Sequence, residues 1–169
     1  MIDISLLLNS DSHLAVFCGM QARGNQFVDC ISQSRGHVGM ISDRLTPFLS
    51  NVDLAENITL PLLYHKNISQ AVAVERLFPS FEALDMLGYM YKRKEDLSRK
   101  QLLAGYLMRA MASGNRFVYL DWPRLWEVDF LLDCLSRIES KIQLWVSVEK
   151  MSVQEYKQRG FEFRDISRD

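Results

Sequence analysis

The sequence has few of the residues that build metal sites, disulfides and membrane segments. Its three cysteines and three histidines are far apart, and none has metal-ligand spacing. Cys18, Cys30 and Cys134 therefore predict buried or free thiols in a reducing compartment. The apolar run within residues 1–13 is too short and too soon broken for a signal peptide or a membrane span. We expect a cytoplasmic protein with no metal centre.

An excess of positive charge is also lacking. The formal net charge is −1 and the isoelectric point is near 6.3, so nothing attracts nucleic acid or an anionic membrane globally. The basic run Lys92-Arg93-Lys94 is followed by Glu95 and Asp96, and we interpret it as a solvated loop face. We expect no nucleic-acid partner. With 48% hydrophobic residues, residues 1–169 suffice for one domain with a core.

Short apolar runs alternate with stretches of helical spacing, which is typical of a mainly parallel α/β sheet covered on both faces. Strands are predicted at residues 14–18, 38–41, 117–120, 142–148 and 161–163. Helices are predicted at residues 24–31, 53–64, 72–77, 81–90, 98–111, 125–138 and 153–158. Gly36 should end the first helix, Pro61 should kink or shorten the second, and Pro79 should separate the third from the fourth. Ser98 is a candidate N-cap, and Gly114-Asn115 should stop that helix.

Residues 97–123 read LSRKQLLAGYLMRAMASGNRFVYLDWP. The run resembles the segment of ABC-transporter ATPases in which LSGGQ, a helix with an IARAL-like turn, a buried strand and Asp-Glu-Pro follow one another. This resemblance implies a truncated P-loop NTPase-like fold with a mainly parallel sheet flanked by helices. It also implies a helical signature subdomain at about residues 53–113 and a reduced antiparallel β-subdomain. We expect no counterpart of the upstream aromatic residue that stacks on adenine in the family.

The family's phosphate loop has a counterpart in outline at residues 19–26, GMQARGNQ. Such a loop needs glycines for close backbone approach, a Lys for the phosphate charge and a hydroxyl for Mg²⁺. Gly19 and Gly24 have the right separation, but Asn25 and Gln26 replace the Lys and the hydroxyl residue. Arg23 could supply some of the missing charge. A plain turn without a ligand fits the same pattern, so ATP with Mg²⁺ is expected to bind weakly if at all.

A second region of resemblance follows the strand at residues 38–41. Asp43 stands where the family has the Q-loop Gln. Residues 54–62, LAENITLPL, resemble the family's ENV-x-LPL helix, which faces the coupling helix of a membrane permease. An ordinary amphipathic helix is the alternative. The sequence of residues 54–62 is similar to that of the corresponding helix in lipid-trafficking and lipoprotein-release ATP-binding subunits.

Several positions that contact nucleotide or act in hydrolysis in the family carry different residues here. Arg99 and Lys100 replace the signature glycines, while Ser98 and Gln101 are kept. Asp121 matches the Walker B Asp, but Trp122 stands where the catalytic Glu would polarise the attacking water. Val148 occupies the switch His position. We expect no catalytic residues; the candidate nucleotide-binding positions are Gly19, Arg23, Gly24, Asn25, Gln26, Asp43, Ser98, Gln101 and Asp121.

Three functions remain open at this point. The first is a degenerate, non-hydrolysing ABC ATPase-like subunit, peripheral on the inner face of the membrane. It would pair with a permease or a competent ATPase subunit, as a homo- or heterodimer. The second is a slow ATPase completed by a partner, and the third is a stand-alone module that senses nucleotide or phosphate. We favour the first, because losing one group that acts only in the transition state costs about 10² to 10⁴ in rate.

Overall fold

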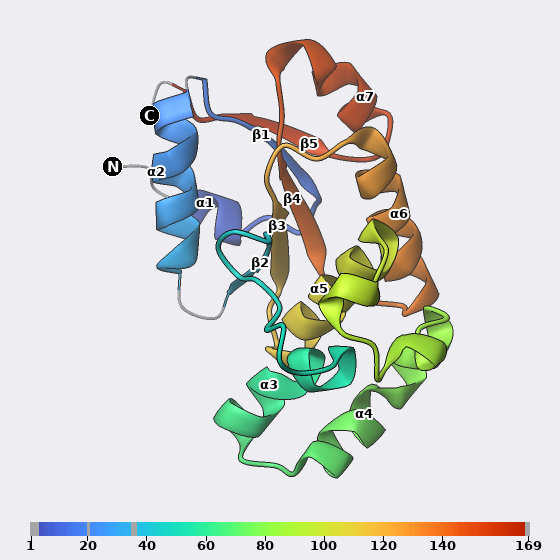
Figure 1. The fold of residues 1–169 in the computed structure, drawn as a ribbon. Coiled ribbons are helices and arrows are strands. Elements are labelled where there is room, and N and C mark those ends of the chain that lie inside the picture. The colour runs from blue at the N-terminus through green and yellow to red at the C-terminus, as the bar shows by residue number, and fades with distance from the viewer. Residues whose placement is uncertain (1–3, 20, 35–36, 168–169) are drawn as a thin grey trace.

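A five-stranded parallel sheet forms the centre of the molecule (Figure 1). The computed structural model describes residues 4–19, 21–34 and 37–167. The strand order is β2-β3-β4-β1-β5, and all four neighbouring pairs are parallel. The strands are β1 Leu14–Phe17, β2 Val38–Ile41, β3 Phe117–Leu120, β4 Gln143–Ser147 and β5 Glu162–Asp165. The predicted parallel α/β fold is confirmed.

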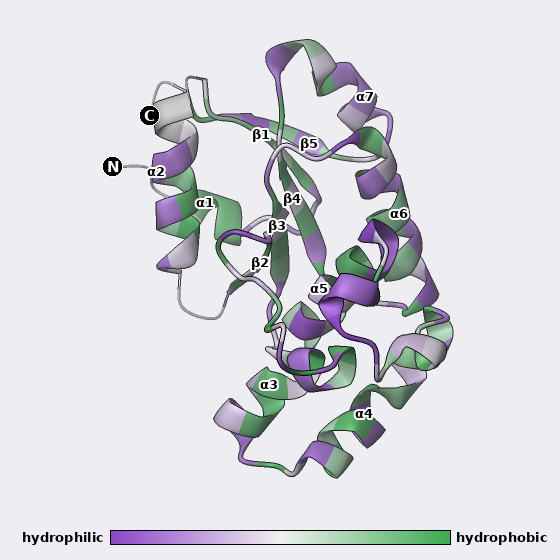
Figure 2. Cartoon of the chain, in the orientation of Figure 1, coloured by the Kyte–Doolittle hydropathy of each residue, from purple (hydrophilic) through white to green (hydrophobic). Residues whose placement is uncertain are grey.

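The strands form because short apolar segments are buried on both faces, as a parallel sheet requires. All four residues of β3 are buried, whereas β5 lies at the edge and is largely exposed. β1 lies between strands from the far end of the chain, with Leu14 opposite both Trp145 and Glu162. Figure 2 shows the central strands mainly in the hydrophobic colour.

Alternate strand residues enter two separate cores, one on each face of the sheet. Leu14, Val16 and Tyr119 pack with the short helix α1 (Ser5–Leu8) and with α2 (Gln21–Ser32). Ala15 and Val118 face the opposite core, under the remaining helices. These helices are α3 Leu54–Lys66, α4 Gln70–Ala83, α5 Arg99–Ala112, α6 Leu125–Arg137 and α7 Val153–Lys157. Three 3₁₀ turns, Leu87–Tyr89, Lys94–Asp96 and Lys150–Ser152, complete the described elements.

The helices α3 and α5 approach each other closely at Gly105. A Cβ atom there would lie 2.9 Å from Leu54 and 3.0 Å from the ring of Phe48. Buried Asn57 fixes the start of α3, because its side chain exchanges hydrogen bonds with both backbone groups of Leu49. These contacts hold α3 and the loop before it against α5.

The prediction that Pro79 separates two helices was wrong, and α3 is not shortened at Pro61. α3 continues through Pro61 to Lys66, and α4 is a single helix that includes Pro79. Each proline removes one helical hydrogen bond, but burial of neighbours such as Leu62, Leu77 and Phe81 offsets that cost. The helix predicted at residues 81–90 ends instead at Ala83, before the 3₁₀ turn at Leu87–Tyr89.

Two further differences concern the predicted subdomains and boundaries. The reduced antiparallel β-subdomain has no counterpart in the part of the chain that the structure describes, where every strand pair is parallel. The first predicted helix begins at Gln21 rather than Gly24 and ends at Ser32; Gly36 lies outside the described residues. Among the described helices, none combines the length and apolar character needed to cross a membrane.

Candidate functional site

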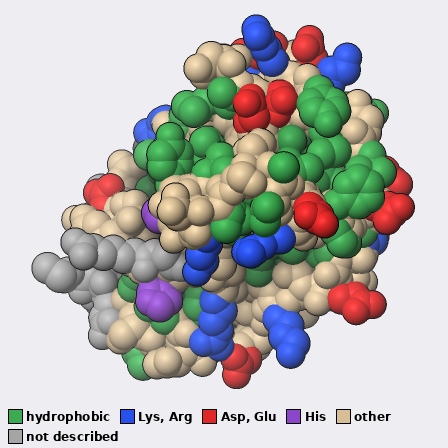
Figure 3. All heavy atoms as spheres, turned by 90° about the horizontal axis from the view of Figure 1, so that it is seen from below, with side chains coloured by type: hydrophobic (Ala, Val, Ile, Leu, Met, Phe, Trp, Pro, Cys, Tyr) green, Lys and Arg blue, Asp and Glu red, His purple; other side chains and the backbone are tan. Residues whose placement is uncertain are grey.

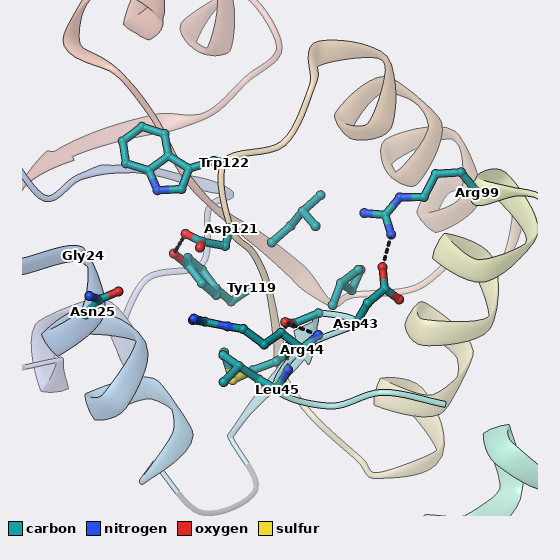
Figure 4. A pocket seen from close by; sticks show the side chains of 13 residues that line it. Gly24, Asn25, Asp43, Arg44, Leu45, Arg99, Tyr119, Asp121 and Trp122 are labelled. Carbon is teal, nitrogen blue, oxygen red and sulfur yellow. Dashed lines mark hydrogen bonds and ion pairs between the residues drawn. The ribbon is translucent and has the colours of Figure 1, made fainter. Parts of the chain in front are cut away.

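A cavity of about 440 Å³ opens at the carboxyl ends of β2 and β3, beside the first turns of α2 (Figure 4). In this sheet β1 connects through α2 to one edge, while β4 connects through α7 to the other edge, so the connections diverge between β1 and β4. Ligand sites of open parallel sheets occur at such a point; this cavity lies to one side of it, at the ends of β2 and β3. The cavity is lined by Gly24, Asn25, Met40, Ile41, Ser42, Asp43, Arg44, Leu45, Arg99, Tyr119, Leu120, Asp121 and Trp122.

The predicted phosphate-loop residues separate in the structure. Gly24 and Asn25 line the cavity, whereas exposed Gln26 does not. Gly19 has φ +75° after β1, and a Cβ there would lie 2.9 Å from Cβ of Ser167. The side chain of Arg23 lies outside the described part of the structure. Because helix α2 already begins at Gln21, the backbone between Gln21 and Gly24 is helical rather than a loop curved around a phosphate.

Asp121 ends a hydroxyl network at the floor of the cavity. Its Oδ1 accepts hydrogen bonds from Tyr119 Oη at 2.7 Å and from Ser147 Oγ at 2.6 Å. The two hydroxyl oxygens lie 2.8 Å apart, and the backbone N–H of Trp122 donates to Ser147 Oγ at 3.0 Å. Burial raises the pKa of Tyr119 far above its ordinary range, so its hydroxyl stays protonated and able to donate. The Walker B position is therefore engaged by the protein itself.

Sequence reasoning missed Tyr119 and Ser147. Tyr119 did carry a signal, because a phenol hydroxyl stands two residues before Asp121 in a strand whose other side chains are apolar. Two residues along a strand face the same side of the sheet, so their side chains can meet. Ser147 carried no comparable signal, since it joins the network only through the pairing of β3 with β4.

Trp122 stands at the mouth of the same cavity with an unusual backbone. Its φ is +45°, a left-handed conformation that is rare for a bulky residue, and 46% of the residue is exposed. It also lines a second cavity of about 290 Å³ together with Ser147 and Glu149. An indole offers no proton acceptor for water activation, so the position of the family's general base carries none.

Asp43 lines the cavity, but both of its carboxylate oxygens are bound by side chains of α5. Its Oδ2 lies 2.8 Å from Nη1 of Arg99, and its Oδ1 accepts a hydrogen bond from Tyr106 Oη at 2.7 Å. Nε of Arg99 also lies 2.8 Å from Oε1 of Glu127, on α6. Arg99 thus binds two carboxylates of its own chain.

The remaining predicted positions have structural roles in this fold. Ser98 and Gln101 form a capping box at the start of α5, as the predicted N-cap requires. Nζ of Lys100 lies over the ring of Phe130 at 5.7 Å. Val148, at the switch position, is buried. The structure therefore gathers Gly24, Asn25, Asp43 and Asp121 in one cavity, whereas Gly19, Gln26, Ser98 and Gln101 do not line it.

These residues do not fit magnesium-ATP in the way that the resemblance requires. The phosphate cradle is replaced by helix, Oδ1 of Asp121 already accepts two hydroxyl bonds, and Trp122 cannot act as a base. No group of three or more His, Cys, Asp or Glu side chains suited to a metal ion occurs among the described residues.

Comparisons with known proteins agree on the fold alone. The sequence matches no protein family and no curated protein. The structure is similar to the ATP-binding cassette MJ0796 in a dimeric post-hydrolysis state bound to ADP and Pi. The TM-score is 0.65 and the identity 12%, over 92% of this chain and 81% of that one.

Two more solved structures extend this likeness. Another dimeric structure of MJ0796, described as a bacterial ABC transporter cassette, gives TM-score 0.65 and 12% identity over 94% of this chain and 83% of that one. An inward-facing transporter described as of the metal-chelate ABC type gives a TM-score of 0.61 and 15% identity. That match covers 83% of this chain and 64% of the other. The chain therefore has the α/β fold of ABC ATP-binding cassettes.

Proposed function

We propose that the protein is a degenerate, non-hydrolysing ABC cassette-like subunit that acts as a structural or regulatory partner of a membrane transport system. Two features support the loss of hydrolysis. Trp122 supplies no base, and the early start of α2 at Gln21 leaves no loop to cradle a phosphate chain. The fold likeness supports the cassette-like role.

The observation that carries the docking role is an apolar groove of about 840 Å³ between α3 and α4. Val74, Phe78 and Met90 contribute apolar walls, and Phe78 is 46% exposed. Figure 3 shows this end of the molecule, where hydrophobic side chains gather with acidic groups among them. Exposed apolar surface of this kind marks interaction sites.

The charges of the groove indicate the partner's chemistry. Asp53, Glu56 and Glu75 line it, and none of the described lining residues is Lys or Arg. Cytoplasmic loops of membrane proteins carry an excess of Lys and Arg, and an amphipathic helix can lay its apolar face into a groove. A short basic amphipathic helix from a permease loop therefore fits this surface.

Residues 53–113 would form the docking subdomain of a single domain, residues 1–169. Such a protein would lie on the cytoplasmic face of the membrane, with the permease as its partner. Its pairing with a competent ATPase subunit, or with a second copy, would use the signature face around Ser98. The sequence LAENITLPL at the start of α3 favours a lipid-trafficking or lipoprotein-type transport system.

A peptide-binding experiment tests the groove directly. A fluorescent amphipathic helix with Lys and Arg on its polar face should bind, and the same helix with Glu there should not. Phe78→Ser should weaken binding about tenfold, because it removes an exposed anchor of the groove. Val72→Ser is the matched control, since Val72 lies on α4 with similar exposure but does not line the groove. Equal weakening by both variants would contradict the docking site.

A phosphate-release assay tests the loss of hydrolysis. Purified protein should give no turnover above background with magnesium-ATP. Turnover at ordinary rates that Asp121→Asn abolishes would refute the proposal. Turnover that appears only on adding a partner subunit would favour the slow ATPase instead.

A further inference from the structure

We propose that a cavity beside the edge strand β2 binds a small carboxylic acid with an apolar body, whose carboxylate is held by Arg109. The cavity, about 400 Å³, lies between β2, the loop that follows it, the second half of α5 and Pro61 of α3 (Figure 1). Arg109 lines neither the cavity that holds Asp121 nor the groove between α3 and α4. The carboxylate site is therefore separate from both.

The guanidinium of Arg109 is held in place by its own chain. Its Nη1 donates to the carbonyl of Pro47 at 3.3 Å, and its Nη2 donates to the carbonyl of Thr46. Its central carbon lies 4.7 Å from the ring centre of Phe48 and 5.0 Å from that of Tyr106. A cation fixed in this way loses little conformational entropy when a ligand binds.

The charge of Arg109 has no carboxylate partner in the part of the chain that the structure describes. Asp43, which accepts a hydrogen bond from Tyr106 Oη, is ion-paired with Arg99 at 2.8 Å. Among the described residues that line the cavity, Arg109 alone is charged. Burial, opposed by a smaller effect of Tyr106, lowers the pKa of Arg109, because the cation is desolvated without a counter-charge. A bound carboxylate would supply that charge.

The donors and the walls together indicate the class of ligand. Two of the five N–H donors of Arg109 serve backbone carbonyls, and the other three have no partner among the described residues. A planar guanidinium matches both oxygens of a carboxylate. Met40, Leu45 and Pro61 add apolar walls. The volume of about 400 Å³ falls within the roughly 300–1,000 Å³ usual for small-molecule sites.

A calorimetric titration of the purified full chain at pH 7.5 gives the first test, with octanoate as the probe. Octanoate should bind saturably at one site. Octanamide has the same chain without the charge and should bind about tenfold to a hundredfold more weakly, because it loses a charge-assisted contact. Octylamine should not bind, since its charge has the same sign as that of Arg109. Acetate should bind weakly, since it has no apolar body.

Variants of the cation then locate the site. Arg109→Gln should weaken octanoate binding about tenfold to a hundredfold and leave octanamide binding unchanged, a difference that a purely structural role would not produce. Arg109→Lys should restore part of the affinity, since it keeps the charge and loses the fork. Arg76→Gln is the control, because Arg76 is an exposed arginine on α4 outside the cavity. Circular dichroism confirms that each variant is folded.

A second pair of variants leaves Arg109 untouched. Ser32 is exposed and lines the cavity from the end of α2, so Ser32→Trp should obstruct octanoate binding. Gln33→Trp is its matched control, because Gln33 is also exposed but does not line the cavity. Phe78→Ser should leave octanoate binding unchanged, which separates this site from the groove between α3 and α4. If Arg109→Gln does not fold, the comparison of Ser32→Trp with Gln33→Trp decides.

Three results would overturn the proposal. The first is no saturable binding of octanoate up to millimolar concentration. The second is equal affinity for octanoate and octanamide, which would mean that no cation recognises the ligand. The third is octanoate binding that Arg109→Gln or Ser32→Trp weakens no more than its control variant does. In each case the cavity beside β2 is not a carboxylate site.

Discussion

Nη1 of Arg99 lies 2.8 Å from Oδ2 of Asp43, although the two residues are far apart in sequence. The contact joins the first turn of α5 to the loop that follows β2. Tyr106, about two helical turns further along α5, donates to the other oxygen of the same carboxylate. Arg99 also binds Glu127 of α6. We call these four side chains the Asp43 clasp; they connect the helical end of the molecule to the sheet.

Breaking the clasp should destabilise the protein. Arg99→Gln leaves the carboxylate of Glu127, whose side chain is 9% exposed, without its cation. We expect a loss of about 1–2 kcal/mol in the free energy of unfolding, measured by urea titration. Arg137→Gln is the control, since it breaks an exposed pair with Asp85 and should change the free energy of unfolding much less than Arg99→Gln does. An effect of Arg99→Gln no larger than the control's would show that the clasp adds nothing.

Replacing the buried Asn57 should lower the free energy of unfolding far more than replacing an exposed asparagine. Its Oδ1 accepts from Leu49 N–H at 2.7 Å, and its Nδ2 donates to the Leu49 carbonyl at 3.0 Å. Asn57→Leu leaves both backbone groups unpaired and should cost about 2–4 kcal/mol in the free energy of unfolding. Asn51→Ala, at an exposed position of the same loop, should change it by less than about 0.5 kcal/mol. Similar values for the two variants would argue against this anchor.

The free energy of unfolding should decrease at acidic pH because of His13. Its Nδ1 accepts a hydrogen bond from Leu144 N–H at 2.8 Å, and burial lowers its pKa below the ordinary 6.5. Below that pH the unfolded chain takes up the proton first. The contribution of His13 is therefore complete above about pH 6.5 and is lost as the pH falls through the lower folded value.

Urea titrations at pH 7.5 and pH 5.5 measure this effect. His13→Asn keeps an acceptor without a titrating ring, so its stability should depend less on pH over this range. His65→Asn, at an exposed position of α3, should keep the wild-type dependence. If the free energy of unfolding changes equally with pH in the wild type and in both variants, His13 is not the cause.

Thiol labelling should follow burial. Burial, with a smaller effect of the Asp121 charge, raises the pKa of Cys18 to about 12, and burial raises that of Cys134 to about 11. At pH 8 both stay protonated and unreactive, so half-buried Cys30 should react first with an aromatic disulfide reagent. Cys30→Ser should abolish the fast phase, whereas Cys134→Ser should leave it intact. A fast phase that survives Cys30→Ser would contradict the expected order.

Restoring the missing carboxylate should not restore hydrolysis. Trp122→Glu places a candidate base after Asp121, but the backbone from Gln21 to Gly24 remains helical and cannot cradle phosphates. We expect phosphate release from magnesium-ATP to stay at background. Turnover in this variant that disappears on adding Asp121→Asn would show that the site retains more of the cassette chemistry than its backbone indicates.

The inner strands were predictable because each is a short apolar run buried on both faces, unlike the exposed edge strand β5. The 38–41 and 117–120 strands agree with β2 and β3. The capping box at Ser98 and Gln101 is likewise a local signal between neighbouring residues. The helix boundary predicted at Pro79 and the shortening predicted at Pro61 were wrong, because tertiary packing of α3 and α4 outweighs the local cost of proline.

The site was less predictable, because its contacts join distant parts of the chain. The hydroxyl network of Tyr119 and Ser147 depends on the pairing of β3 with β4, which no local pattern encodes. The Arg99–Asp43 pair depends on how α5 packs against the sheet. Arg44 lines the cavity from a turn after β2, where a single charged residue in a loop carries no recognisable signal.

The position of β1 has a consequence for how the chain folds. Leu14 pairs with Trp145 and Glu162, so β1 has no neighbour in the sheet until β4 and β5 emerge from the ribosome. Until then, its apolar side chains are exposed to solvent or to chaperones. Folding of the sheet should therefore be slow and should begin only after β4 has been synthesised. Shortened chains lacking β4 and β5 should aggregate rather than accumulate as a partial domain.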